Sequence, residues 1–286
     1  SEKGVEIAAG EFSGFFNALQ TVRQLIRKDN KKYSMPYCRI KDAPAFPVRG
    51  LMLDVGRNYM SVPFLKSVVR RLSHYKINVL HLHLSDDPGW RVEVNKYPEL
   101  TVETSFWPTR QPGKFYTQED IKSICDFCDS LNIRVIPEID MPGHSAAFRK
   151  AIGKDMQTPE GMQVLKEALD EIIPLFKDSL FHIGSDEVHF KMKEFMPEMI
   201  RYVRSKGKQV VVWYPGYAPD SNAVRMCWGE YEAGYSLDKS APYIDCNGFY
   251  MDWMDSQGGV LQTFFQYPCE VPQAGGKALG SEICVW

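Results

Sequence analysis

From about residue 46 onward, short apolar runs alternate with stretches whose apolar residues recur at helical spacing. Four runs of strand length come first: GLMLDV (50–55), INVLHLHL (77–84), IRVIPEI (133–139) and SLFHIG (179–184). Four more follow: KQVVVWY (208–214), AVRMCW (223–228), APYID (241–245) and KALGSEICVW (277–286). VPFLKSVVRRLSHYK, TQEDIKSICDFCDSLN, residues 159–176 and KEFMPEMIRYVRSKG have the helical period between them. Continuous rather than alternating apolar strands indicate a parallel sheet that is covered on both faces.

Eight such strands favour one closed (β/α)8 barrel over an open doubly wound sheet, because a barrel of this kind takes about 250 residues. No G-x-G-x-x-G sequence follows any of the strands, which argues against a dinucleotide site. We therefore assign residues 47–286 to a barrel.

Residues 1–46 do not follow this alternation. The stretch GVEIAAGEFSGFFNALQTVRQLIRK predicts one strand and then a helix that begins near Ser13. We interpret residues 1–46 as part of a small α+β domain that precedes the barrel.

Composition and charge exclude several classes of function. The chain has 286 residues, 24% of them charged, with a net charge of -2 and no long basic run, so a nucleic-acid partner is not expected. No apolar stretch approaches the ~20 residues that span a bilayer. The seven cysteines are an odd number and do not indicate a disulfide framework. Cys125 and Cys128 have the spacing of one helix face, so we interpret them as core residues and predict no metal site.

Polar or aromatic side chains stand at the end of every predicted strand, where barrel enzymes place their active sites. Taken singly, each has a structural explanation: a surface ion pair for an arginine, a turn cap for an aspartate, core packing for a tryptophan. For His81, His83 and His182, which lie within strands, we expect a packed and hydrogen-bonded role. Together the strand ends predict a sugar site, with acids and an arginine for hydroxyl groups and flat aromatic faces for the ring. The candidates are Arg57, Asp86, Asp140, His144, Asp186, Glu187, Trp213, Trp228, Tyr243, Asp245 and Trp286.

The sequence HIGSDEV places Asp186 and Glu187 side by side after the fourth strand. Adjacent carboxylates disfavour double ionisation, so one of them stays protonated near neutral pH. Cleavage of a glycosidic bond needs such a carboxylic acid to protonate the leaving oxygen. The spacing does not reveal which of the two acids protonates or what the other one does.

Four motifs together resemble glycoside hydrolase family 20, the β-N-acetylhexosaminidases: RGLMLDVGRNYM, NVLHLHLSDDPGW, IPEIDMPGH and HIGSDEV. EFSGFFNALQTVRQLI also resembles the end of that family's small N-terminal domain. The resemblance covers nearly the whole chain in order. It implies a retaining exo-glycosidase that removes terminal N-acetylglucosamine or N-acetylgalactosamine from glycans and needs no cofactor. It also favours a periplasmic, secreted or lysosomal location over a cytoplasmic one.

The resemblance also implies roles for the candidate residues. Glu187 matches the family's buried general acid/base, and Asp186 matches the aspartate that orients the 2-acetamido group of the substrate. Asp86 and His144 match a relay to the acid, with Asp140 on the same loop as His144. The remaining matches concern sugar binding: Arg57 for ring hydroxyls, Trp213, Trp228 and Trp286 for the walls, and Tyr243 with Asp245 for the Tyr-x-Asp/Asn pair that holds the acetamido oxygen and a distal hydroxyl.

The chain departs from the family pattern in two places. Asn58 stands where the family has a histidine after the arginine, and the family's pattern continues past Trp286 with a Gly/Thr-Glu whose glutamate binds sugar hydroxyls. The barrel is therefore expected to be truncated after its eighth strand. Two alternatives to substrate-assisted hydrolysis remain: a conventional retaining glycosidase with two carboxylates about 5–5.5 Å apart, and a sugar-binding protein without catalysis on the same scaffold.

Overall fold

The computed structural model describes residues 4–217, 220–228, 241–246, 250–251 and 277–286. Eight parallel strands close into a barrel in the order β10-β11-β12-β3-β4-β7-β8-β9. All eight strands were predicted, and the predicted (β/α)8 fold class is confirmed. Their bounds are β3 Val48–Asp54, β4 Val79–His83, β7 Arg134–Glu138, β8 Leu180–His182, β9 Gln209–Tyr214, β10 Val224–Cys227, β11 Pro242–Asp245 and β12 Lys277–Val285.

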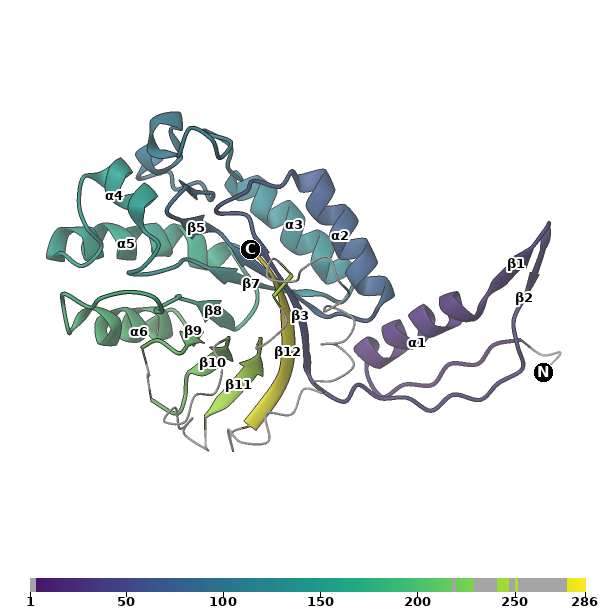
Figure 1. The fold of residues 1–286 in the computed structure, drawn as a ribbon. Helices are drawn as coiled ribbons and strands as arrows, with labels where there is room; N and C mark the ends of the chain where they lie inside the picture. Colours follow the sequence, from purple (N-terminus) through teal and green to yellow (C-terminus); the bar gives the residue numbers. More distant parts are fainter. Residues whose placement is uncertain (1–3, 218–219, 229–240, 247–249, 252–276) are drawn as a thin grey trace.

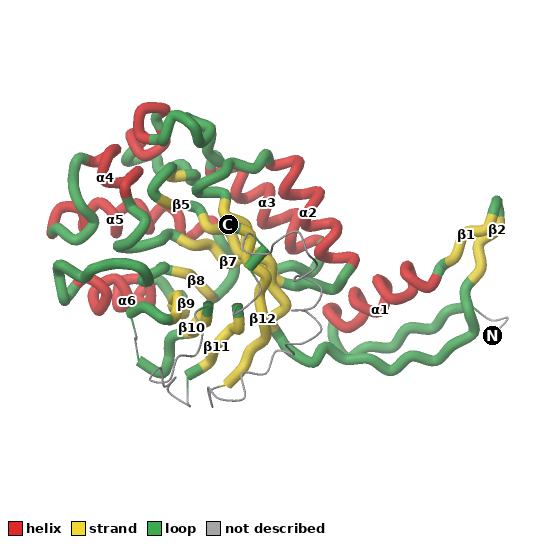
Figure 2. The backbone as a smooth tube through the Cα atoms, viewed as in Figure 1, coloured by secondary structure: helices red, strands yellow, loops and turns green. Residues whose placement is uncertain are grey.

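Helices surround the barrel on the sides that the described residues cover (Figures 1 and 2). They are α2 Val62–His74, α3 Gln118–Ser130, α4 Ala146–Ile152, α5 Pro159–Ile172 and α6 Phe195–Ser205, with short 3-10 turns η1 Pro98–Thr101, η2 Glu103–Ser105 and η3 Ile173–Leu175. A small hairpin of β5 Ser85–Asp86 and β6 Gly89–Trp90 follows β4. No helix in the described part of the chain combines the length and the apolar character that a membrane span requires.

The strands separate two apolar layers. Met52, Val211 and Ile244 belong to a cluster inside the barrel, whereas Leu53, Leu80 and other neighbours pack against the surrounding helices. Successive residues of a strand point to opposite faces, so alternate positions of each strand belong to the interior. This alternation decides which side chains at a strand end can reach the site.

Local signals position the helices as the sequence predicts. The side chain of Thr117 caps α3 in a capping box with Asp120. Ile121, Cys125 and Cys128 form the buried face of this helix, and burial raises the pKa of both thiols to about 12. The interpretation of the two cysteines as core residues is confirmed.

The N-terminal segment extends away from the barrel (Figure 1). It contains α1 Phe12–Leu25 and a hairpin of β1 Arg27–Asp29 and β2 Lys32–Ser34. The helix begins one residue before the predicted position. The predicted strand before it is wrong, because residues 4–10 have no neighbouring strand among the described residues. The division of the chain at residue 46 stays a prediction.

Candidate active site

A pocket of about 320 Å³ opens at the carboxyl ends of the barrel strands. Its lining draws on segments after six different strands and on β9 itself, so the closed barrel brings together residues up to 229 positions apart in the chain, from Arg57 to Trp286. The lining residues are Arg57, Asp140, His144, Asp186, Glu187, Trp213, Trp228, Tyr250 and Trp286. Eight of these nine were predicted from the sequence as site residues. Tyr250 was not.

Arg57 is fixed at the pocket by two carboxylates. Its Nη1 donates to Oδ2 of Asp54 at 2.8 Å, and its Nη2 lies 2.8 Å from Oδ2 of Asp86. The guanidinium also lies 5.1 Å from the ring centre of Trp286. Asn58, the departure from the family pattern, faces elsewhere and accepts a hydrogen bond from Arg110 at 2.6 Å. The planar fork of Arg57 is therefore held in one orientation from three sides.

His144 lies between two acidic groups. Its Nε2 is 3.3 Å from Oε2 of Glu187, and its Nδ1 is 3.9 Å from Oδ2 of Asp86. Asp86 is buried, which opposes ionisation, but a hydrogen bond and charge from His83 and the charge of Arg57 hold its pKa below its usual range. Asp86 is thus an ionised group that connects Arg57, His83 and His144.

The turn that carries the carboxylate pair has an unusual backbone. Gly184, Ser185 and Glu187 have φ values of 64°, 95° and 48°, and His144 across the pocket has 45°. A Cβ at position 184 would lie 1.6 Å from Oδ1 of Asp140, so only glycine fits there. Non-glycine residues in this region cost free energy and cluster at functional sites.

The two acids of the pair have different surroundings. Asp186 is 9% exposed, whereas the Glu187 side chain is 57% exposed. The expectation of a buried glutamate at position 187 is therefore wrong for this structure, because the turn directs its side chain to the rim. Burial, together with the charges of Glu138 and Glu187, raises the pKa of Asp186 to about 7.

Asp140 lies next to Asp186 and is buried. Its backbone N–H donates to Oγ of Ser85 at 3.1 Å. Burial and the charges of Glu138 and Asp186 raise the pKa of Asp140 well above its usual range. Adjacent buried carboxyls of this kind share their protons. Burial and the neighbouring charges therefore oppose the ionisation of Asp140.

Aromatic rings form the walls. The Trp213 ring centre lies 5.5 Å from that of Trp286, and Tyr250 stands edge-on to Trp286 at 5.9 Å. Trp228 follows β10 directly, and its backbone N–H donates to the carbonyl of Tyr214 at 2.9 Å. Rings in offset and edge-on arrangements make rigid apolar faces. The predicted position of the three tryptophans on one side of the barrel agrees with this lining.

Tyr243 and Asp245 are not among the lining residues, which corrects their prediction as pocket residues. They alternate along β11 with Ile244, which belongs to the interior cluster, and Tyr243 packs instead with Cys227. Tyr250 reaches the pocket because its segment pairs with Cys284 of β12. The sequence carried the signal, since Tyr-x-Asp recurs at 250–252. Asp252 lies outside the described residues.

Some groups in the described residues have the spacing of metal ligands. Asp140, His144 and Asp186 offer ligand atoms within 4.8 Å of one another, and so do His81, Glu138 and His182 inside the barrel. A metal in the first group would displace the protons that Asp140 and Asp186 hold. The prediction that the site needs no metal stays a prediction.

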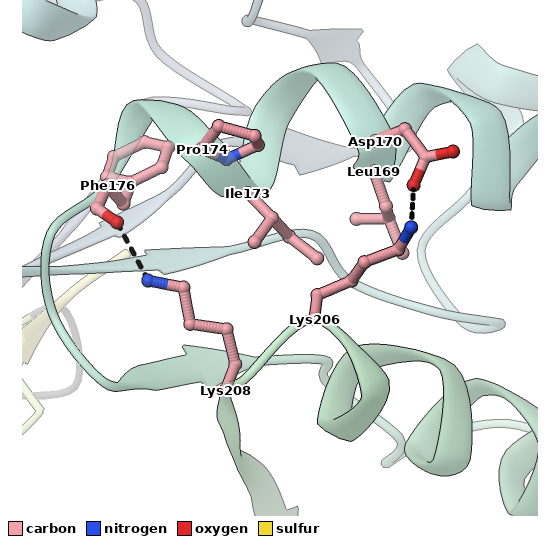
Figure 3. Close-up of a pocket in the computed structure, with 7 residues that line it drawn as sticks. All are labelled: Leu169, Asp170, Ile173, Pro174, Phe176, Lys206 and Lys208. Carbon is pink, nitrogen blue, oxygen red and sulfur yellow. Dashed lines mark hydrogen bonds and ion pairs between the residues drawn. The ribbon is translucent and has the colours of Figure 1, made fainter.

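A second hollow, of about 550 Å³, lies at the opposite end of the barrel, before the start of β9 (Figure 3). Lys206 pairs with Asp170 at 2.7 Å, and Lys208 donates to the carbonyl of Phe176 at 2.7 Å. The rest of its lining is apolar: Leu169, Ile173 and Pro174. Its one carboxylate, Asp170, is paired with Lys206, which lowers its pKa and disfavours the protonated form that an acid catalyst needs, so we assign the chemistry to the pocket at the carboxyl ends.

Comparison with known proteins agrees with the geometry. Residues 46–160 match the model of the glycosyl hydrolase family 20 catalytic domain. This match includes Arg57, Asp86, Asp140 and His144 and ends before the carboxylate pair. The chain belongs to glycoside hydrolase family 20.

Relatives and solved structures extend the family 20 match beyond residue 160. The chain is 33% identical to a β-hexosaminidase of Vibrio furnissii and to a β-N-acetylhexosaminidase of Cellulomonas fimi, each over 74% of its length. It covers only 44% and 48% of these two relatives. An exo-β-N-acetylglucosaminidase of Vibrio harveyi, solved with N-acetylglucosamine, superposes with a TM-score of 0.84 at 27% identity, covering 100% of this chain and 57% of that one. A mutant β-hexosaminidase of Streptomyces plicatus with the product GlcNAc gives 0.84 at 26% identity, covering 96% and 66%.

Proposed function

We propose that this family 20 chain is the catalytic part of a retaining exo-β-N-acetylhexosaminidase, which removes terminal N-acetylglucosamine or N-acetylgalactosamine from glycans. The observation that carries the proposal is the pocket itself. One cavity of about 320 Å³ brings a carboxylate pair, a fixed arginine and three tryptophans together. That volume suits a single sugar ring, which fits removal of one terminal residue at a time.

The two acids lie at different depths in the pocket, and each acts on a different part of the substrate. Asp186 lies inside the pocket and Glu187 at its rim. In an exo-acting enzyme the terminal sugar enters the pocket and the leaving group stays outside it. Glu187 therefore stands where the leaving oxygen must be protonated, and it acts as the general acid and later as the general base. His144, 3.3 Å from Glu187, orients that carboxyl and responds to its charge.

Asp186 acts on the substrate's 2-acetamido group. Its carboxylate accepts the amide N–H, which turns the carbonyl oxygen toward the anomeric carbon. That oxygen attacks as the leaving oxygen takes the proton, and a cyclic oxazolinium ion forms in place of a glycosyl-enzyme ester. Water then opens the ring with Glu187 as base, so the β configuration is retained. This substrate-assisted route is the known exception to the two-carboxylate mechanism.

The electrostatics of Asp186 suit this role. A pKa of about 7 in the free protein means that its charge is costly before substrate arrives. The amide hydrogen bond and the positive oxazolinium both favour the ionised form. The charge is therefore stabilised most where positive charge develops, which is how a site favours a transition state over its ground state. Tyr250 lines the pocket and Tyr243 does not, which supports Tyr250 as the residue that holds the acetamido carbonyl.

The test is a panel of nitrophenyl β-glycosides that differ at carbon 2 and carbon 4. The proposal expects hydrolysis of the 2-acetamido sugars and very poor hydrolysis of the matching glucoside and galactoside. A thiazoline mimic of the cyclic intermediate should inhibit strongly. Equal rates with and without the 2-acetamido group, or a glycosyl ester trapped on Asp186, would move the chain to the conventional two-carboxylate class. Binding of the sugars without any turnover would support the sugar-binding alternative.

A further inference from the structure

Glu138 is a charged residue at the centre of the barrel that none of the roles above uses. It is the last residue of β7 and is fully buried. Its Oε1 accepts a hydrogen bond from the indole Nε1–H of Trp213 at 2.6 Å. Its Oε2 lies 2.7 Å from Nδ1 of His83. It does not line the pocket, yet it contacts a residue that does.

The contact to His83 leads to the other side of the pocket. Nε2 of His83 lies 3.0 Å from Oδ2 of Asp86, and the same oxygen of Asp86 lies 2.8 Å from Nη2 of Arg57. One carboxylate thus connects two parts of the site. Oε1 fixes the plane of the Trp213 wall, and Oε2 fixes the chain that ends at Arg57.

The charges are consistent with this connection. Burial favours a neutral Glu138, but the neighbouring histidines and their hydrogen bonds lower its pKa well below its usual range. Burial lowers the pKa of His83, but the charge of Glu138, hydrogen bonds that the ring donates to Asp86 and Glu138, and the charge of Asp54 raise it well above its usual range. His83 is therefore a buried cation between two anions. A buried ion is unfavourable unless partners satisfy it, so these paired groups hold their geometry tightly.

We propose that Glu138 is a positioning residue that sets the distance and orientation of the Trp213 wall relative to the Asp86–Arg57 side of the sugar pocket. The effect that we expect on hydrolysis rests on the proposed function, whereas the effect that we expect on the position of Trp213 does not. A displacement of about 1 Å in such a site costs about 10²-fold in rate. Removal of the Glu138 charge therefore acts on both sugar binding and turnover.

Glu282 offers a matched control inside the same barrel. It is also fully buried, and its Oε1 lies 2.8 Å from Nδ1 of His81. His81 also lies 3.0 Å from Glu138, so both carboxylates contact the same histidine. In the part of the chain that the structure describes, Trp213 and His83 contact Glu138 and not Glu282. If neutralisation of histidine charge were the only role of Glu138, Glu282→Gln and Glu138→Gln would act alike.

The experiment compares these two variants in the full chain. We expect Glu138→Gln to lower kcat/KM on a nitrophenyl N-acetylglucosaminide about 10²-fold, with KM raised and kcat lowered. The inhibition constant of the thiazoline should rise in parallel. Glu282→Gln should change kcat/KM less than about 5-fold, because the contacts of Trp213 and His83 remain. Equal losses in the two variants would overturn the proposal.

A measurement that needs no turnover accompanies the kinetics. In protein labelled with ¹⁵N-tryptophan, a hydrogen bond to a carboxylate moves the Trp213 indole proton downfield, and Trp213→Phe identifies this signal by its loss. The signal should move upfield in Glu138→Gln and stay in place in Glu282→Gln. An unmoved signal in Glu138→Gln would overturn the proposal even if activity fell. If the unmodified chain hydrolysed no hexosaminide, the proposed function would fail while this comparison still decided the role of Glu138.

Trp213→Phe also serves if Glu138→Gln does not fold. It keeps an aromatic ring in the wall but removes the N–H that donates to Glu138, together with the smaller ring of the indole. We expect about a tenfold weaker thiazoline affinity from the lost hydrogen bond to a charged group. Unchanged affinity would overturn the connection between Glu138 and the wall.

Discussion

Nε2 of His144 lies 3.3 Å from Oε2 of Glu187, across the mouth of the pocket. The histidine comes from the loop after β7 and the glutamate from the turn after β8, and both have positive φ values. Two strained backbones thus meet at one contact. In the proposed mechanism Glu187 transfers the proton and His144 orients the Glu187 carboxyl. Substitutions of the two residues should therefore have different effects on the rate.

Glu187→Gln should lower kcat at least ~10²-fold on substrates with poor leaving groups, because the amide cannot donate the proton that they need. The loss should shrink for dinitrophenyl glycosides, whose leaving group departs without protonation. Steady-state rates over a series of aryl leaving groups measure this. His144→Asn should lower the rate less and leave the dependence on the leaving group in place. A near-normal rate of Glu187→Gln on natural linkages would contradict the role.

Tyr250→Phe and Tyr243→Phe form a matched pair, since each removes one hydroxyl and keeps the ring. Tyr250 lines the pocket and Tyr243 does not. Loss of a hydrogen bond to the developing charge on the acetamido oxygen should cost about 10²-fold in kcat for Tyr250→Phe. Tyr243→Phe should stay within about 3-fold of the unmodified rate. The reverse order would restore the assignment first made from the sequence.

Stability should depend on pH through Asp186. Its pKa is about 7 in the folded chain against 3.8 in the unfolded chain, so the folded state holds the proton more tightly. The resulting stabilisation is complete below pH 3.8 and is lost as pH rises through 7, by a few kcal/mol in all. Asp186→Asn stays neutral, so it should melt at a higher temperature than the unmodified chain at pH 8, with the difference fading toward pH 4. Thermal unfolding followed by circular dichroism measures this.

Asp155 supplies a control of opposite sign. Burial raises its pKa, but hydrogen bonds from Lys191 and the Gln157 N–H and the charges of Lys191 and Arg149 lower it by more, so the net shift is downward. Its contribution to stability is present above the unfolded pKa and is lost as pH falls through the folded one. Asp155→Asn should therefore melt below the unmodified chain near neutral pH and approach it in acid. The same slope in both variants would contradict the assignment of the pH effect to Asp186.

Arg57→Lys should raise KM by about tenfold or more with a smaller change in kcat. A lysine keeps the charge but cannot contact Asp54 and Asp86 at once while presenting donors to a sugar hydroxyl. Substrate saturation curves of Arg57→Lys and Arg110→Lys separate this effect from a general effect of replacing a guanidinium with an ammonium group, since Arg110 lies outside the pocket lining. Equal KM values in the two variants would argue against the role of Arg57.

The barrel was predictable because a strand that is covered on both faces is apolar at successive positions and does not alternate between apolar and polar residues. Runs such as INVLHLHL show this directly. The position of the pocket was predictable as well, because the carboxyl ends of parallel strands all lie on one side of the barrel. The prediction that Tyr243 and Asp245 line the pocket was wrong. β11 is only four residues long, so the sequence does not show which of its residues face the barrel interior. Two Tyr-x-Asp sequences stand seven residues apart, and only the alternation of faces along the strand distinguishes them.

Two other features needed coordinates. The exposure of Glu187 depends on a turn with φ values that residue types do not specify. The role of Glu138 depends on contacts with His83 and Trp213, which lie 55 and 75 positions away in the sequence. A signal for it was present: Glu138 is an acid inside the apolar strand IRVIPEI, at an interior position. The histidines within the strands were correctly expected to be packed and hydrogen-bonded. The sequence analysis did not identify Glu138 as the partner that they share.

In the proposed mechanism the substrate's own acetamido oxygen attacks the anomeric carbon. A series of aryl 2-acetamido glycosides whose N-acetyl methyl group carries zero, one, two or three fluorine atoms tests this attack. Fluorine withdraws electrons from the carbonyl oxygen and weakens it as a nucleophile. We expect log kcat/KM to fall steeply and steadily with each added fluorine, and a rate that does not change across the series would contradict attack by this oxygen.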